Sequence, residues 1–380
     1  MFYLDHNATT PTRPEALEVV QRTGRDFFGN PSSLHRFGRE ARALLEEGRE
    51  RLGELLGVRG AELVFTSGGT EANRLAIEGA LEGVKGDPCH AVVSAIEHPS
   101  VLDVYEHLGS RPGLATTRVV AGEDGRVRPG DLLSALRPET RVLSLQHANN
   151  ETGVIQDVCG LAQGLLERAG DPPLLHVDAV QSFGKLTVRP RELGADLVAL
   201  SSHKVGGPKG VGALWVQPGR GYASPVRGGP QERRMRPGTE NLPAILGFVR
   251  AAELALEAVS VKGPAAATGL RQLLGEKVPG VRFNGGPVAV LPNTVNVSFE
   301  GVAAELLVIR LDQEGVAVST GSACASGSRE PSHVLVAMGL AAERVRSAVR
   351  FSTGWTTREA EVEAAVEVVR RVVEELRECG

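Results

Sequence analysis

The stretch DLVALSSHKVGGPKG, residues 196–210, joins a run of apolar residues to a glycine-rich turn that contains two lysines. Lysine is rare in this chain: there are six lysines among 42 basic residues, so arginine carries most of the positive charge. A lysine amine can lose its proton and attack a carbonyl group, whereas a guanidinium stays charged. Lys204 and Lys209 are therefore candidates for chemistry, although solvated lysines of a surface turn would give the same pattern.

Around this stretch, from residue 60 to residue 216, short apolar runs alternate with helical patterns. The runs are uniformly apolar, as in strands that are covered on both faces. The alternation is typical of a mostly parallel sheet wrapped by helices. The strand candidates are residues 62–65, 90–95, 141–146, 174–177, 196–200 and 212–216, and the helix candidates are residues 70–82, 99–108 and 157–169.

The pattern changes after an amphipathic stretch near residues 241–259. The later segments predict a smaller α+β domain, with strands at 293–299 and 316–319 and helices near 303–314 and 357–378. We therefore expect an α/β protein with a large domain formed by residues 15–258. Residues 1–14 and 259–380 are expected to form the small domain.

Composition excludes several kinds of protein. The formal net charge is −4, which favours neither nucleic acid nor a membrane surface as a partner. No segment approaches the roughly 18 consecutive apolar residues of a membrane span, and MFYLDHNATT lacks a basic leader pattern, so we expect a cytoplasmic protein. The four cysteines, at 89, 159, 324 and 379, form no C-x-x-C pair, so we expect neither a metal site nor a disulfide framework.

Polar clusters follow the strand candidates, and ligands of such sheets bind beyond the carboxyl ends of the strands. TSGGTE opens a helix, where free N–H groups and Thr70 can hold a phosphate. No G-x-x-x-x-G-K-[ST] or G-x-G-x-x-G motif is present, which argues against nucleoside triphosphates and NAD. Asp178 ends another strand, where it can also simply cap a turn. Pyridoxal phosphate needs an amine, an anion against its pyridinium nitrogen and a phosphate pocket, and Lys204, Asp178 and the Ser67–Thr70 turn supply all three.

Several motifs then resemble those of the class I (NifS/IscS-like) cysteine desulfurases, members of the pyridoxal-phosphate fold type I aminotransferase superfamily. The resemblance runs from Tyr3 to about Gly354. It is carried by YLDHNATTP, FGNPSSLHRFG, FTSGGTEANRLAI, HANNETGVIQ, HVDAVQS, SSHKVGGPKGVGAL, RPGTEN and STGSACASGSREPSHVL. It implies a large domain with a mostly parallel seven-stranded sheet and a smaller α+β domain.

The resemblance also implies roles around the cofactor ring. Lys204 would form the Schiff base, while Lys209 would be structural. Asp178 would meet the pyridine nitrogen, and Gln181 would hydrogen-bond the phenolate oxygen. His98 would stack on the ring and help to move protons.

Other implied contacts concern the phosphate and the substrate. The residues implied at the phosphate are Gly69, Thr70, Ser201, His203 and, from a second subunit, Thr239. A shared site of this kind implies a homodimer. Asn150 would contact both cofactor and substrate, and Arg350 would clamp the substrate's α-carboxylate with its planar fork.

Cys324 lies among small residues in VSTGSACASGS, which predicts an accessible, mobile loop over about residues 319–332. The resemblance implies that Cys324 attacks the sulfur of cofactor-bound L-cysteine, leaving L-alanine and a persulfide on Cys324. The persulfide would pass to an acceptor, either an iron–sulfur scaffold or a thiolation protein. No basic residue adjoins Cys324, so a more distant group must favour its thiolate.

Alternative functions remain open at this point. A selenocysteine lyase, another aminotransferase or an α,β-lyase would use the same cofactor. A non-catalytic scaffold that kept the fold is disfavoured by the intact set of candidate residues. Some relatives carry a C-terminal tail that docks an iron–sulfur scaffold; this sequence ends in VVEELRECG, so we do not expect docking by that route.

Overall fold

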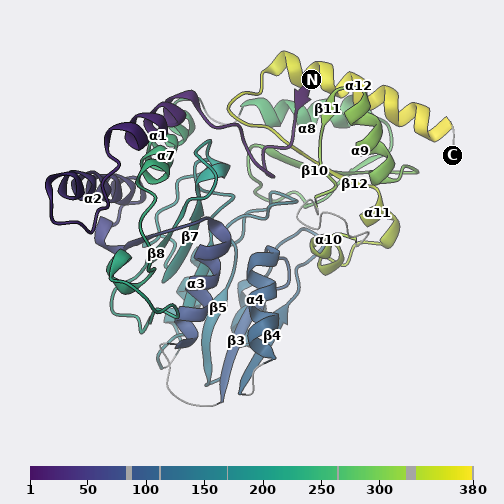
Figure 1. Ribbon diagram of the computed structural model, residues 1–380. Coiled ribbons are helices and arrows are strands. Elements are labelled where there is room, and N and C mark those ends of the chain that lie inside the picture. The colour runs from purple at the N-terminus through teal and green to yellow at the C-terminus, as the bar shows by residue number, and fades with distance from the viewer. Residues whose placement is uncertain (83–87, 111–112, 169, 263–264, 322–330, 379–380) are drawn as a thin grey trace.

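The computed structural model describes residues 1–380 except 83–87, 111–112, 169, 263–264, 322–330 and 379–380. Its largest sheet has seven strands in the order β2-β8-β7-β6-β5-β3-β4 (Figure 1). Every neighbouring pair is parallel except the two that involve β8. This confirms the predicted α/β class and the mostly parallel sheet. The strands are β2 (Leu63–Thr66), β3 (Cys89–Ser94), β4 (Leu114–Val119), β5 (Thr140–Ser144), β6 (Leu174–Asp178), β7 (Leu197–Ser201) and β8 (Gly212–Val216).

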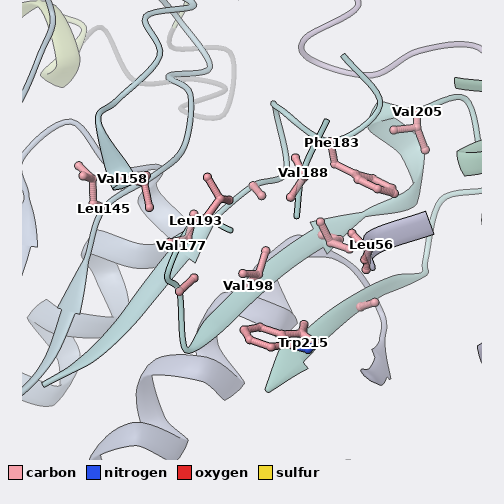
Figure 2. Packing of buried hydrophobic residues seen from close by; sticks show 14 of the residues in the cluster. Leu56, Leu145, Val158, Val177, Phe183, Val188, Leu193, Val198, Val205 and Trp215 are labelled. Atoms are coloured by element: carbon pink, nitrogen blue, oxygen red, sulfur yellow. The ribbon is translucent and has the colours of Figure 1, made fainter. Parts of the chain in front are cut away.

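Helices cover both faces of this sheet, as its apolar strands require. On one face lie α3 (Gly69–Glu82) and α4 (Pro99–Gly109), which stand in front of the strands in Figure 1. The buried cluster of the other face includes Val198 and Trp215 (Figure 2). Its helices are α1 (Pro14–Asp26), α2 (Arg36–Leu56), α5 (Pro129–Ser134), α6 (Val158–Leu166) and α7 (Leu242–Lys262).

Strand β6 shows how the sheet directs side chains. Leu175 and Val177 belong to the cluster on the face drawn in Figure 2. Successive side chains of a strand point to opposite faces, so Leu174, His176 and Asp178 point toward α3 instead. The last of these residues ends the strand, and its carboxylate therefore emerges at the rim of the sheet.

The C-terminal third of the chain builds a smaller antiparallel sheet in the order β12-β10-β9. Its core consists of Leu4 and buried residues between 270 and 373. The domain division stays a prediction, and α10 and α11 contribute residues to the core of the large sheet. The elements are α8 (Ala265–Lys277), β9 (Val281–Phe283), β10 (Thr294–Phe299), α9 (Ala304–Gln313), α10 (His333–Ala337), α11 (Ala342–Arg346), β12 (Ala348–Ser352) and α12 (Glu359–Glu378).

The N-terminal segment links the two sheets. Strand β1 (Phe2–Tyr3) pairs in parallel with β11 (Val316–Ala317), beside the smaller sheet. The chain then crosses to α1 on the far side of the large sheet (Figure 1). Residues 4–13 consequently pass between the two parts of the molecule.

Four strands were not predicted from the sequence: β1, β4, β9 and β12. Strands β1 and β9 contain only two and three residues. Strand β4 is an edge strand in which Thr116 and Thr117 are only partly buried and Arg118 is exposed, so the apolar signal is weak. Strand β12 carries Arg350 at its centre, which interrupts its apolar run. The predicted strand at 316–319 is shorter, since only Val316 and Ala317 form β11. Within the described residues, no helix combines the length and the apolar character needed to cross a membrane.

Candidate active site

A cavity of about 210 Å³ lies at the carboxyl ends of β5, β6 and β7. Because parallel strands end at one rim of a sheet, the polar turns that follow them meet there. Thr239 is exposed and does not line the cavity, and Cys324 lies outside the described residues. The other predicted site residues all line it: Gly69, Thr70, His98, Asn150, Asp178, Gln181, Ser201, His203, Lys204 and Arg350.

Lys204 ends a single 3-10 turn, η2 (Ser202–Lys204), directly after β7. Its Nζ donates to the backbone carbonyls of Asn7, at 2.6 Å, and Ala8, at 2.8 Å. Lys209 is exposed and lies outside the cavity. Of the two lysines in the opening stretch, only Lys204 is therefore placed to react with a bound molecule.

Asp178 is buried, with 7% of its surface exposed. Its Oδ1 accepts the backbone N–H of Val180 at 2.9 Å, and its Oδ2 accepts the amide of Asn73 at 2.7 Å. Both contacts come from donors, as an ionised carboxylate requires. The side chain can present this negative charge to a positively charged ring nitrogen in the cavity.

His98 caps the N-terminus of α4 and also lines the cavity. Its Nδ1 accepts the backbone N–H of Ser100 at 3.1 Å. Burial lowers the pKa of the imidazole, with a smaller opposing effect from Asp178. A neutral ring that accepts at Nδ1 carries its proton on Nε2. His98 can therefore cap α4 and line the cavity at the same time.

The start of α3 forms one wall of the cavity. Gly69 is required there, because a Cβ at this position would lie 2.7 Å from Cγ2 of Val180. Helix α3 begins at this glycine, so its free N–H groups and its dipole favour an anion. Ser201 and His203 line the same cavity, and burial, followed by the charge of Lys204, lowers the pKa of His203 to about 4.

Arg350 reaches the cavity from the smaller sheet. One guanidinium nitrogen donates to Asp5 Oδ1 at 2.6 Å, and another donates to the backbone carbonyl of Asn150 at 3.0 Å. Its Nε is buried without a hydrogen-bond partner in the described part of the chain, and so is Oδ1 of Asn150. An unsatisfied buried donor is costly unless a ligand supplies an acceptor, and a carboxylate does so.

A family model described as aminotransferase class V matches residues 2–365 of the chain. The chain belongs to the aminotransferase class-V family. It is 40% identical over 380 residues to a cysteine desulfurase IscS of Dictyoglomus turgidum, covering 99% of this chain and 95% of that one. It is 43% identical over 378 residues to a cysteine desulfurase of Cereibacter sphaeroides, covering 99% and 96% of the two chains.

Solved structures agree with these relatives. A NifS-like protein superposes with a TM-score of 0.89 at 31% identity, over 98% of this chain and 99% of that one. A structure of SspA in complex with cysteine gives 0.81 at 33% identity, over 93% and 98% of the two chains. The fold class and the family expected from the sequence motifs are therefore confirmed.

For a class-V aminotransferase, pyridoxal phosphate is the expected cofactor, and the cavity fits it. The N-terminus of α3 at Gly69 suits a phosphate, and Asp178 and Lys204 line the same cavity. The unpartnered Nε of Arg350 and Oδ1 of Asn150 leave polar groups for an amino acid. Among the described residues, no cluster of three or more histidine, cysteine and acidic side chains could hold a metal ion.

Sequence reasoning missed four polar residues that line the cavity, namely Asn7, Asn73, Ser100 and Gln146, and the half-buried Lys185 beside them. Lys185 donates to Gln181 Oε1 at 2.7 Å and to Asn7 Oδ1 at 3.2 Å. Burial, with a further effect of the Lys204 charge, lowers the pKa of Lys185 well below its usual value. The rarity of lysine that singled out Lys204 applies equally to Lys185, which lies four residues after Gln181.

Proposed function

We propose that this protein is a pyridoxal-phosphate-dependent cysteine desulfurase. It would convert L-cysteine to L-alanine and leave the sulfur as a persulfide on Cys324. Relatives of this name are about 40% identical over nearly the whole chain. The observation that carries the proposal is the meeting of Lys204, Asp178 and Arg350 in one cavity, since these provide an amine, an anion and a carboxylate clamp.

When bound, the cofactor supplies an electron sink conjugated to the substrate's amino group. Lys204 would hold the cofactor and, once released by the substrate amine, move a proton at the substrate's Cα. Asp178 would face the ring nitrogen, and Gln181 would donate to the phenolate oxygen. His98 would stack on the ring.

The remaining residues position the two ends of the reaction. Gly69, Thr70, Ser201 and His203 would hold the phosphate, and Arg350 with Asn150 would hold the substrate carboxylate. The Cys324 thiolate would attack the substrate sulfur, so that an S–S bond forms and the C–S bond breaks. The electron pair of that bond would go to Cβ, which becomes the methyl group of alanine after protonation.

A homodimer is part of this proposal. Thr239 is exposed and outside its own cavity, as suits a residue that serves a partner's phosphate site. Phe28, Leu34 and Phe37 expose 71%, 89% and 52% of their surface, and exposed apolar clusters of this kind often mark interfaces. The sulfur acceptor would be a protein of iron–sulfur assembly or of thiolation, in the cytoplasm, where a reducing environment keeps the attacking thiol available.

Peptide mapping after incubation with L-cysteine tests the proposal. We expect one added sulfur on the Cys324 peptide and a borohydride-fixed pyridoxyl group on the Lys204 peptide. The native mass of the protein in solution should be twice the 40.1 kDa mass of the chain. Cys324→Ser should abolish alanine formation, while Cys159→Ser, at an exposed cysteine of α6, should not change it. Unchanged turnover of L-cysteine by Cys324→Ser would instead support an α,β-lyase.

A further inference from the structure

Asp178 is the end of a buried hydrogen-bond network whose centre is Asn73 on α3. The Asn73 amide donates to Asp178 Oδ2 at 2.7 Å and to Ser100 Oγ at 3.0 Å. Its carbonyl oxygen contacts His176 Nε2 at 3.1 Å. Both N–H groups and the carbonyl oxygen of this amide therefore have partners, and Asn73 is 1% exposed.

The orientation of Asn73 is decided by its two neighbours on β6. A carboxylate accepts hydrogen bonds only, so the NH₂ group must face Asp178 and the carbonyl must face His176. Burial lowers the pKa of His176 to about 3, so the ring is neutral and has one N–H. That N–H must be on Nε2, because Nε2 faces the Asn73 carbonyl.

The network continues away from the cavity in one direction only. With its proton on Nε2, His176 accepts at Nδ1 from Ser144 Oγ, at 2.9 Å. Ser144 must then accept from the Tyr105 hydroxyl, at 2.6 Å. The sheet brings these groups together, since Ser144 and His176 are paired in register between β5 and β6 and α4 supplies Tyr105.

The far end of the network is closed. Tyr105 is 1% exposed and Ser144 and His176 are 0% exposed, so the network ends in the core and offers no route to water. A path for protons would need a group in contact with water, and none of these three side chains is in contact with it. The arrangement instead fixes the direction of one amide.

The same amide is linked to His98. Ser100 Oγ, which accepts from Asn73, lies 2.8 Å from His98 Nδ1, and the Ser100 backbone donates to the same nitrogen. Asn73 thus contacts Asp178 directly and His98 through Ser100, and both of these line the cavity. Nearby Glu97 adds no second buried anion at neutral pH, because burial raises its pKa to about 8.

We propose that Asn73, held in one orientation by the Nε2–H of His176, is a positioning residue that fixes Asp178 and His98 against the cofactor ring. The inference rests on the proposed function, because that function defines the ring. The role of Asn73 is indirect: its amide fixes the positions of the Asp178 and His98 side chains, and His176 fixes the orientation of that amide.

The first test compares two buried histidines. His176→Phe removes the donor to Asn73, whereas His90→Phe removes an imidazole that is equally buried and equally bonded, to Thr140 and Thr117 at the opposite end of the sheet. We expect His176→Phe and Asn73→Ala to raise the Kd of pyridoxal phosphate by roughly tenfold, equivalent to about 1.4 kcal/mol. They should also shift the pH midpoint of the bound cofactor's visible absorbance.

His90→Phe should lower the thermal midpoint to a similar extent and change neither the Kd nor the absorbance midpoint. His176→Gln keeps an N–H near the position of Nε2 and should restore most of the affinity. If His176→Phe changes only the thermal midpoint, as His90→Phe does, the inference is wrong. Failure of the wild-type chain to bind the cofactor would instead contradict the proposed function.

The second test is read in the wild-type protein and uses a variant only to assign the resonances. In ¹⁵N-histidine-labelled wild-type protein, the His176 resonances, assigned by their loss in His176→Gln, should report the Nε2–H tautomer. They should do so with and without cofactor and from pH 6 to pH 8, as expected for a neutral buried ring. An Nδ1–H tautomer or a charged ring in this range would overturn the proposed orientation of Asn73.

Discussion

The guanidinium of Arg350 is 2% exposed and still keeps one N–H without a partner among the described residues. Its other contacts, to Asp5 and to the Asn150 carbonyl, fix the plane of the group. A planar fork held in this way is ready to bind a carboxylate with little further loss of side-chain entropy. The guanidinium of Arg350 thus has a fixed orientation as well as a positive charge.

Arg350→Lys tests this difference between direction and charge. The ammonium keeps the charge but loses the fork, so we expect the KM for L-cysteine to rise roughly 10–100-fold and kcat to change less. Steady-state kinetics of alanine formation would measure both. Arg344→Lys is the control, because Arg344 makes comparable contacts to Asn284 and Phe283 outside the cavity. Equal KM values for both variants would contradict a role in carboxylate binding.

Which site residues could be found from the sequence depends on where each lies along the chain. Lys204 and Asp178 follow strands, so the parallel sheet alone brings them to one rim. Asn73 could not be found in this way, because its partners come from β6 and from the start of α4. The roles assigned by resemblance stay predictions, including that of Cys324, which lies outside the described residues.

At the level of elements, buried strands gave the clearest sequence signal. Strands β5 to β8 are covered on both faces and were predicted to within one or two residues. Edge strand β4 and the arginine-bearing β12 did not stand out, since partial exposure in β4 and a buried charge in β12 interrupt the apolar pattern. The smaller sheet is also built from distant segments, whose pairing no local pattern specifies.

Strand β8 lies close to the turn at residues 67–70, at a position where only glycine fits. A Cβ at Gly212 would lie 2.6 Å from the Leu200 carbonyl oxygen and 2.7 Å from the Gly68 backbone carbon. Both neighbours are backbone atoms and cannot move aside singly. Gly212 pairs with Thr66 and Ser201, so any shift would displace β2 or β7 beside the cavity.

We therefore expect Gly212→Ala to lower the free energy of unfolding by about 2 kcal/mol or more and to weaken cofactor binding. Urea unfolding and a cofactor titration would measure the two effects. Gly130→Ala in α5 is the control, because a Cβ there meets no atom within 4 Å. Its stability should stay the same or rise by up to about 1 kcal/mol. Wild-type stability in Gly212→Ala would mean that the β2–β8–β7 spacing is not as tight as the structure shows.

For the molecule as a whole, the N-terminal segment holds the cavity together. Asp5 pairs with Arg350 of the smaller sheet, while Asn7 accepts from Lys204 and from Gln181 of the large sheet. The Asn7 amide also donates to Thr294 on β10. The cavity therefore exists only when both sheets and this segment are assembled, which is why composition and periodicity alone could not define it.

Burial also makes the stability of the whole molecule depend on pH. Buried histidines resist protonation in the folded state but take up protons when unfolded, whereas buried Glu97 and Glu151 have raised pKa values and act in the opposite sense. Burial lowers the pKa of four histidines to about 3 or 4, namely His6, His147, His176 and His203. Because these four histidines with lowered pKa values outnumber the two glutamates with raised pKa values, the histidines decide the net effect. The free energy of unfolding should therefore fall as the pH drops below about 6.5.

His147 allows this to be tested at a single group outside the cavity. It is 7% exposed, its Nδ1 contacts Ser182 Oγ at 2.9 Å, and burial lowers its pKa to about 4. Its contribution is present above the unfolded pKa of about 6.5 and is lost as the pH falls toward 4, at up to about 1.4 kcal/mol per pH unit. Between pH 7 and pH 5, His147→Gln should therefore lose about 2 kcal/mol less than the wild type in urea unfolding. An equal loss in both proteins would mean that His147 is protonated as readily in the folded chain as in the unfolded one.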